Sequence, residues 1–185
     1  MKENKKKIII ASVILFIILA LIVTIIIVNH KEDIPVISKD KIEDTITQYL
    51  IEEDKKQEDN YKEYSDFKTF INLKIVGIEL DGNKTYVYAW ALVEDYHVKE
   101  DVAELGSGSS MAYKFTMKND KITKCENPED GDGYAESMKL LFPEEIYEKL
   151  VAIDGSEDLI EGLDEQVKQY YGDKYNKETM INIEQ

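Results

Sequence analysis

Histidine and cysteine, the residues that most often carry catalysis or bind metals, are almost absent from this chain. The only histidines are His30 and His97, and the only cysteine is Cys125. Metalloprotease chemistry needs two histidines one helical turn apart with a glutamate between them, and a zinc site needs three or four nitrogen, sulfur or carboxylate ligands. We find neither arrangement, and we interpret Cys125 as a small apolar residue of a strand rather than a reactive thiol.

A serine–histidine mechanism would have to combine His97 with a serine such as Ser107 or Ser109. No nucleophile elbow surrounds either serine. The glycines of this run could expose backbone N–H groups to an anion, but the neighbouring residues supply no cation for such a site. We therefore predict a polar connection over residues 99–110, in which the glycine- and serine-rich run 106–110 is a mobile loop.

Acidic side chains are the remaining candidates for chemistry. They gather within a short segment, interleaved with glycines: Glu126, Asn127, Glu129, Asp130, Gly131, Asp132 and Gly133. Oxygen ligands on a glycine-rich loop are typical of calcium sites, and Asp130 and Asp132 are the candidate ligands. The EF-hand spacing is not met, and the alternative is a turn that caps the following helix. We predict no cofactor and no catalytic residue.

Aromatic residues form the candidate ligand site. Tyr86, Tyr88 and Trp90 alternate along one predicted strand, and Tyr113 belongs to the next. Aromatic side chains on a sheet usually pack beneath helices, but in an open α+β fold they can line an apolar pocket with polar tips. Both interpretations stay open at this point.

A long apolar segment precedes all of these residues. Residues 8–28 form an apolar run of 21, interrupted only by Ser12 and Thr24, and four lysines lie before it. As a helix the run is ~31 Å long, close to the ~30 Å hydrocarbon core of a bilayer. Because lysine is retained on the cytoplasmic side, we predict a signal-anchor in the cell membrane with residues 1–7 cytoplasmic and the C-terminal part extracytoplasmic. The alternative is a cleaved secretory signal, but such signals have shorter apolar regions, of ~7–15 residues, and end in a small-x-small site that is missing here.

The charge of the chain limits the classes of molecule that it can bind. The formal net charge is −15, and the first 30 residues contribute four lysines and one glutamate, so the rest of the chain carries −18. An acidic surface excludes nucleic acid as a partner. The predicted partners are the lipid bilayer and an envelope or membrane protein. The abundance of Ile, Lys, Glu and Asn is compatible with the AT-rich genome of a Gram-positive bacterium.

Hydrophobic periodicity predicts a helix followed by strands. Ile42, Ile46, Tyr49 and Leu50 share one face of a helix that Ser38 or Asp40 caps. Strands are expected at residues 67–80, 85–98, 111–118 and 121–126, with a bulge at Gly77 and turns at residues 81–83 and 119–120. The second strand is apolar on both faces, so it should be the central one, covered on both sides.

The last third of the chain is predicted to be helical. One helix opens at Asp132 or Gly133 and another at Pro143. Ser156 caps the last helix, which ends at Gly172 and points four residues inward: Leu159, Leu163, Val167 and Tyr170.

This order of elements predicts an α+β fold with a curved, roughly four-stranded antiparallel sheet and C-terminal helices. The arrangement is that of cystatin-like and NTF2-like folds, an analogy that carries no function. We predict a cytoplasmic basic tail (1–7), a transmembrane helix (8–28), a stalk (29–38), an extracytoplasmic α+β domain (39–172) and a loose tail (173–185).

Two segments resemble a known family. They are the run Val87-Tyr88-Ala89-Trp90-Ala91-Leu92 and the set Pro128, Asp130, Gly131, Tyr134, Ala135, Ser137, Met138, Lys139, Leu141, Phe142 and Pro143. Together they resemble an uncharacterised extracytoplasmic domain of clostridial and bacillary membrane proteins, which occurs alone behind one span or fused to antibiotic-sensing membrane metallopeptidases. The resemblance covers residues 40–172 and implies a non-catalytic module. The peptidase part is absent here, so no protease residue is carried over.

We therefore expect a single-pass membrane protein whose non-catalytic extracytoplasmic domain binds a protein partner or ligand in envelope sensing. One alternative is an envelope hydrolase that uses acidic residues, which would need two carboxylates in a cleft. The other is a structural or assembly protein that acts through its anchor and stalk.

Overall fold

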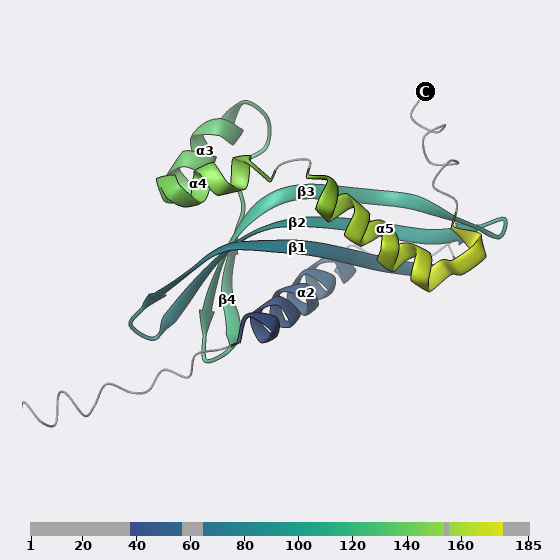
Figure 1. The fold of residues 1–185 in the computed structure, drawn as a ribbon, viewed down its shortest axis with the longest axis horizontal. Helices are drawn as coiled ribbons and strands as arrows, with labels where there is room; N and C mark the ends of the chain where they lie inside the picture. The colour runs from purple at the N-terminus through teal and green to yellow at the C-terminus, as the bar shows by residue number, and fades with distance from the viewer. Residues whose placement is uncertain (1–37, 57–64, 154–155, 176–185) are drawn as a thin grey trace, which may run out of the picture. The chain divides into compact units, whose positions relative to one another are not determined.

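The computed structural model describes residues 38–56, 65–153 and 156–175 (Figure 1). The predicted basic tail, transmembrane helix and nearly all of the predicted stalk lie outside these residues. Among the helices of the described part, none is long and apolar enough to cross a membrane.

Helix α2 (Lys39–Lys55) is the first described element. The side chain of Ser38 accepts a hydrogen bond from the backbone N–H of Lys41 at 3.3 Å, which confirms the predicted N-cap. Ile42, Ile46 and Leu50 are buried, as their helical spacing predicts. The apolar face of α2 therefore packs onto the sheet.

Four strands form one antiparallel sheet in the order β1-β2-β3-β4: β1 (Ser65–Asp81), β2 (Lys84–Lys99), β3 (Val102–Lys118) and β4 (Lys121–Glu126). The predicted α+β class with a curved sheet and C-terminal helices is confirmed (Figure 1). The register of β1 against β2 shifts between Ile75 and Gly77, which is the predicted bulge. Gly82 has φ +58°, and Asn119 and Asp120 have φ of 50° and 61°, so both predicted turns are tight hairpin turns.

The prediction of a connection at residues 99–110 with a mobile loop at 106–110 is wrong, because most of this segment belongs to β3. The connection is only the turn Glu100–Asp101, and the β2–β3 ladder starts at the pair of Lys99 with Val102. The glycines make room for side chains of β2. A Cβ atom at Gly106 would lie 3.2 Å from Nδ1 of His97, and one at Gly108 would lie 3.3 Å from Cγ of Glu94. A composition typical of loops here lets a strand lie beside two large side chains.

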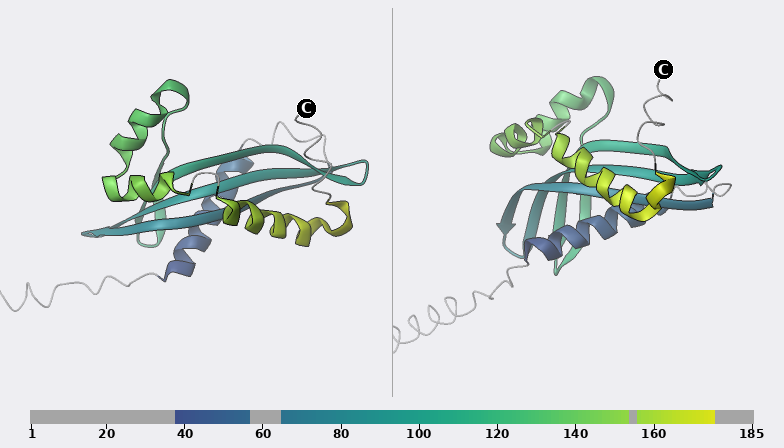
Figure 2. Two further views of the ribbon diagram at one scale, coloured as in Figure 1. Left: turned by 45° about the horizontal axis from the view of Figure 1, so that its top comes forward. Right: turned by 45° about the vertical axis from the view of Figure 1, so that its right-hand side comes forward.

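Helices cover both faces of the sheet (Figure 2). Alternate residues of β2 point to opposite faces, so β2 is covered on both sides, as predicted. Val87, Ala89, Ala91 and Val93 pack with α2 in one hydrophobic cluster. On the opposite face two further clusters contain residues of α3 (Tyr134–Leu141), α4 (Glu144–Val151) and α5 (Glu157–Tyr171).

The C-terminal helices differ from the prediction at two positions. Pro143 is the N-cap of α4 rather than its first residue. In α5 the buried tyrosine is Tyr171, while Tyr170 is 47% exposed. Leu159, Leu163, Val167 and Tyr171 keep a spacing of four residues, which places Tyr171 and not Tyr170 on the buried stripe. Gly172 ends the helix with φ +57°, as predicted.

The described contacts continue past Gly172. Residues Gly172–Lys174 form the short 3-10 helix η3, and Tyr175 pairs with Ala103 of β3 in an isolated parallel bridge. Tyr175 is partly buried against the cluster that contains Tyr171. Tyr175, which belongs to the stretch assigned to a loose tail, therefore packs on the domain.

Candidate binding groove at the edge of the sheet

Strand β1 lies at an edge of the sheet, because only β2 pairs with it. Between Lys68 and Ile75, where the register is regular, the even-numbered residues face α5, as the packing of Phe70 with α5 residues shows. The odd-numbered residues of this segment face α2, where Ile71 and Leu73 are buried. The backbone of β1 on the side away from β2 therefore lies between two helices.

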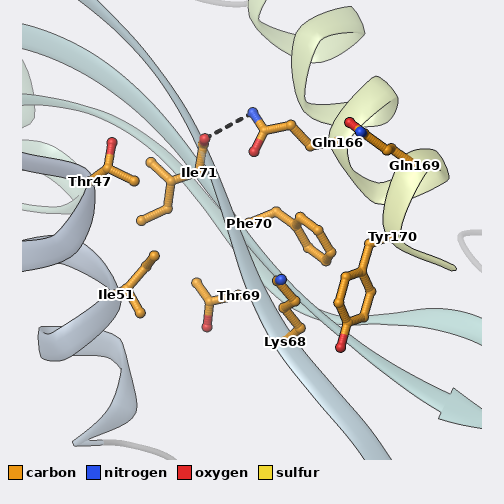
Figure 3. A pocket seen from close by; sticks show the side chains of 9 residues that line it. All are labelled: Thr47, Ile51, Lys68, Thr69, Phe70, Ile71, Gln166, Gln169 and Tyr170. Atoms are coloured by element: carbon orange, nitrogen blue, oxygen red, sulfur yellow. Dashed lines mark hydrogen bonds between the residues drawn. The ribbon is translucent and has the colours of Figure 1, made fainter. Parts of the chain in front are cut away.

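A groove with a volume of about 480 Å³ opens along this edge (Figure 3). Its floor is the β1 segment 68–71. One wall is formed by Thr47 and Ile51 of α2, which are one helical turn apart, and the other by Gln166, Gln169 and Tyr170 of α5. The groove exists because α2 and α5 cover opposite faces of the sheet and leave its edge open between them.

Hydrogen bonds and ring contacts hold the groove's side chains in place. Gln166 Nε2 donates to the backbone carbonyl of Ile71 at 3.1 Å. The ammonium of Lys68 lies over the ring of Tyr170, 3.9 Å from its centroid. The Tyr170 hydroxyl donates to Oδ1 of Asp66 at 3.1 Å, and this hydrogen bond raises the pKa of Tyr170.

The lining of the groove offers groups that form hydrogen bonds. The described lining residues offer two amides, two threonine hydroxyls, one phenol and one ammonium, with no carboxylate. Thr69 already donates to Oδ2 of Asp54 at 2.9 Å. Amides and hydroxyls recognise peptide groups and other neutral polar groups, and no nucleophile lies beside a base among these lining residues.

The structure does not bring the four predicted aromatic residues together. Tyr88 and Trp90 are buried against α3 and α4, whereas Tyr113 lies on the α2 face and stacks on Phe115. Trp90 Nε1 donates to Ser110 Oγ at 2.8 Å. Tyr86 is partly buried beside the first pair. None of the four lines the groove at the β1 edge.

The two calcium candidates lie on the surface. Asp130 and Asp132 are exposed, and Asp132 is in the 3-10 helix η2 (Gly131–Gly133) that leads into α3. The backbone N–H of Glu129 donates to Ser137 Oγ at 2.9 Å, a contact that ties this turn to α3. In the described part of the chain no three His, Cys, Asp or Glu side chains are close enough to hold a metal ion.

Ser107, one of the two serines considered as partners of His97, is hydrogen-bonded to a different residue. Ser107 Oγ donates to Oδ2 of the buried Asp95 at 2.6 Å. Nε2 of His97 lies 4.0 Å from Oε2 of Glu104. The second oxygen of Asp95, Oδ1, is buried without a hydrogen-bond partner. These contacts pair the serine with the carboxylate instead of the imidazole.

Sequence reasoning missed the groove because its parts are far apart along the chain. Residues 47–51, 68–71 and 166–170 come from three elements, and no motif links them. The one available signal is that α2 and α5 carry polar Thr47, Gln166 and Gln169 next to their buried stripes. No known protein family, curated protein or solved structure matches the chain.

Proposed function

We propose that this chain is a single-pass membrane protein whose extracytoplasmic α+β domain binds a protein partner, without catalysis, in envelope sensing. The observation that carries the proposal is the groove between α2 and α5, which leaves the edge of β1 accessible beside neutral polar side chains. Sheet edges with unpaired backbone groups are recurrent sites of protein recognition.

The membrane part of the proposal is supported by the apolar run of residues 8–28 and by the lysines before it. It assigns the protein to the cell membrane, with the N-terminus cytoplasmic. A cystatin-like or NTF2-like arrangement is the finer fold that we propose for the extracytoplasmic part, because a helix precedes a curved antiparallel meander.

Labelling of introduced cysteines tests the topology. In a Cys125→Ala background, a membrane-impermeant maleimide should label Asn83→Cys in intact cells. Asn83 is exposed in the turn between β1 and β2. Lys5→Cys should be labelled only after the cells are lysed. Equal labelling of both variants in intact cells would disprove the proposed orientation.

Site-specific crosslinking in living cells tests partner binding. A photoreactive amino acid at Gln169, inside the groove, should give an adduct with one specific protein of the membrane or envelope. The matched control is Ile160, which is 44% exposed on the same helix and nine residues away, half a turn around it. The proposal fails if both positions give the same adducts or if Gln169 gives none.

A further inference from the structure

We infer that the groove binds its partner by strand addition: an extended, basic segment of the partner protein pairs with β1 as a fifth strand of the sheet. This inference rests on the proposed function and names the binding mode and the chemistry of the partner.

One side of the β1 backbone faces away from β2 and offers hydrogen-bonding groups at the edge of the sheet. Gln166 reaches the carbonyl of Ile71 from α5, so this carbonyl points away from β2. In an antiparallel strand the N–H and C=O of one residue point to the same side, and those of the next residue point to the other. The register is regular from Lys68 to Ile75, so Thr69, Ile71 and Leu73 all present their backbone groups to the edge.

These three residues offer a template for a further strand. At about 3.3 Å per residue, the floor formed by residues 68–71 is roughly 13 Å long, enough for four residues of an extended segment. The backbone of such a segment would meet the N–H and C=O groups of Thr69 and Ile71. It would replace the Gln166 amide at the Ile71 carbonyl, exchanging one N–H···O bond for another.

The net negative charge of α2 and α5, the two helices that carry the walls, indicates a basic segment. Helix α2 carries six acidic residues and three lysines, and α5 carries five acidic residues and one lysine. Side chains of an added strand would alternate between these two walls, so lysine or arginine on either side would meet negative potential. Lys68, the one cation among the described lining residues, is directed onto the ring of Tyr170.

The same charge argues against a second copy of this chain as the occupant. Two copies that each carry a formal charge of −15 repel one another. The occupant is therefore a different protein with a basic extended segment.

The test uses the full-length chain in detergent and a defined probe. The probe is a labelled, capped peptide of about eight residues in which two valines alternate with two lysines, so that lysine faces both walls. Fluorescence anisotropy should show binding that weakens as salt is added, because the attraction is electrostatic. A peptide with glutamate in place of lysine should bind at least roughly tenfold more weakly. Gln169→Trp should abolish binding by filling the groove, while Ile160→Trp should leave it intact.

Amide hydrogen exchange distinguishes strand addition from side-chain binding. Saturation with the lysine peptide should slow exchange of the Thr69, Ile71 and Leu73 N–H groups at least roughly tenfold. The N–H groups of Phe70 and Asn72 point to β2 and should exchange at unchanged rates.

Three results would overturn the inference. If the lysine peptide does not bind, or if the glutamate peptide binds equally well, the partner segment is not basic. If the peptide binds in the groove and leaves exchange at Thr69, Ile71 and Leu73 unchanged, the partner does not add a strand. The crosslinking experiment at Gln169 is independent of both readouts, so partner binding at the groove can stand when strand addition fails.

Discussion

The side-chain amide of Gln166 donates to the backbone carbonyl of Ile71 at 3.1 Å, across 95 residues of sequence. This bond links α5 to the edge strand of the sheet. It also occupies one of the backbone acceptors that the proposed strand addition would use.

Removing this amide should weaken the domain slightly. We expect Gln166→Ala to lower the free energy of unfolding by about 1 kcal/mol, because the Ile71 carbonyl loses its partner. Gln169→Ala is the matched control, since Gln169 lines the same groove and has no hydrogen bond to a described residue in the structure; its effect should stay within about 0.5 kcal/mol. Urea unfolding measures both, and equal losses would contradict the role of the Gln166–Ile71 bond.

The effect of Gly162→Ala on the free energy of unfolding should change sign when the side chain of Asn72 is removed. A Cβ atom at Gly162 would lie 2.4 Å from Nδ2 of Asn72, which donates to the Leu159 carbonyl at 2.8 Å. Gly162→Ala should therefore destabilise the wild-type protein by about 1 kcal/mol, since it displaces this amide. In an Asn72→Ala background the clash is gone, and the same change should stabilise the helix by about 0.5–1 kcal/mol. A double-mutant cycle in urea measures the coupling, and additive effects would refute it.

Two serines at helix N-termini should respond differently to alanine. Ser38 accepts a hydrogen bond from the Lys41 N–H, whereas Ser156 occupies the N-cap of α5 without a side-chain cap bond, and its hydroxyl is buried without a partner. Ser38→Ala should cost about 1 kcal/mol of unfolding free energy. Ser156→Ala should cost less than about 0.5 kcal/mol or stabilise, because it removes an unsatisfied buried hydroxyl. Thermal unfolding compares the two variants, and a loss for Ser156→Ala that equals or exceeds the loss for Ser38→Ala would contradict this prediction.

The free energy of unfolding should fall at alkaline pH because two neighbouring groups, Tyr113 and Cys125, lose their protons. Burial raises the pKa of the Tyr113 phenol to about 12 from 10.0 and that of the Cys125 thiol to about 12 from 9.0. The folded state holds these protons more tightly, so their contribution is complete below the unfolded pKa and is lost as pH rises through the folded pKa. Each group can remove up to about 1.4 kcal/mol per pH unit in this window.

Replacement of the thiol isolates its share. Cys125→Ala should make the loss of unfolding free energy between about pH 9 and about pH 11 shallower, because one of the two titrations is gone. Urea unfolding at several pH values measures the slope. A slope identical to that of the wild-type protein would show that the thiol titrates alike in both states.

Periodicity predicted the elements and their buried faces well. Ile42, Ile46 and Leu50 recur at helical spacing and are buried in α2. Val87 and Tyr88 alternate in β2 and pack on opposite faces of the sheet. Both patterns are local, and apolar side chains leave water whatever element covers them.

Amino-acid composition gave a wrong prediction for a segment whose conformation depends on residues of another strand. The run Gly106–Ser110 is typical of a loop, yet it lies in β3 beside the His97 and Glu94 side chains. The prediction of Tyr170 as a buried residue of α5 is wrong for a different reason: only Tyr171 keeps the four-residue spacing of Leu163 and Val167.

The sequence alone determined the α+β class, the antiparallel order of strands, the turns, the N-caps of α2 and α5 and the acidic charge, because each depends on residues close together in the chain or on composition. Only the tertiary structure decided that Thr47, Ile71 and Gln166 meet at one edge of the sheet. Their meeting depends on the directions in which α2 and α5 cross opposite faces, and packing among residues far apart in the chain sets those directions.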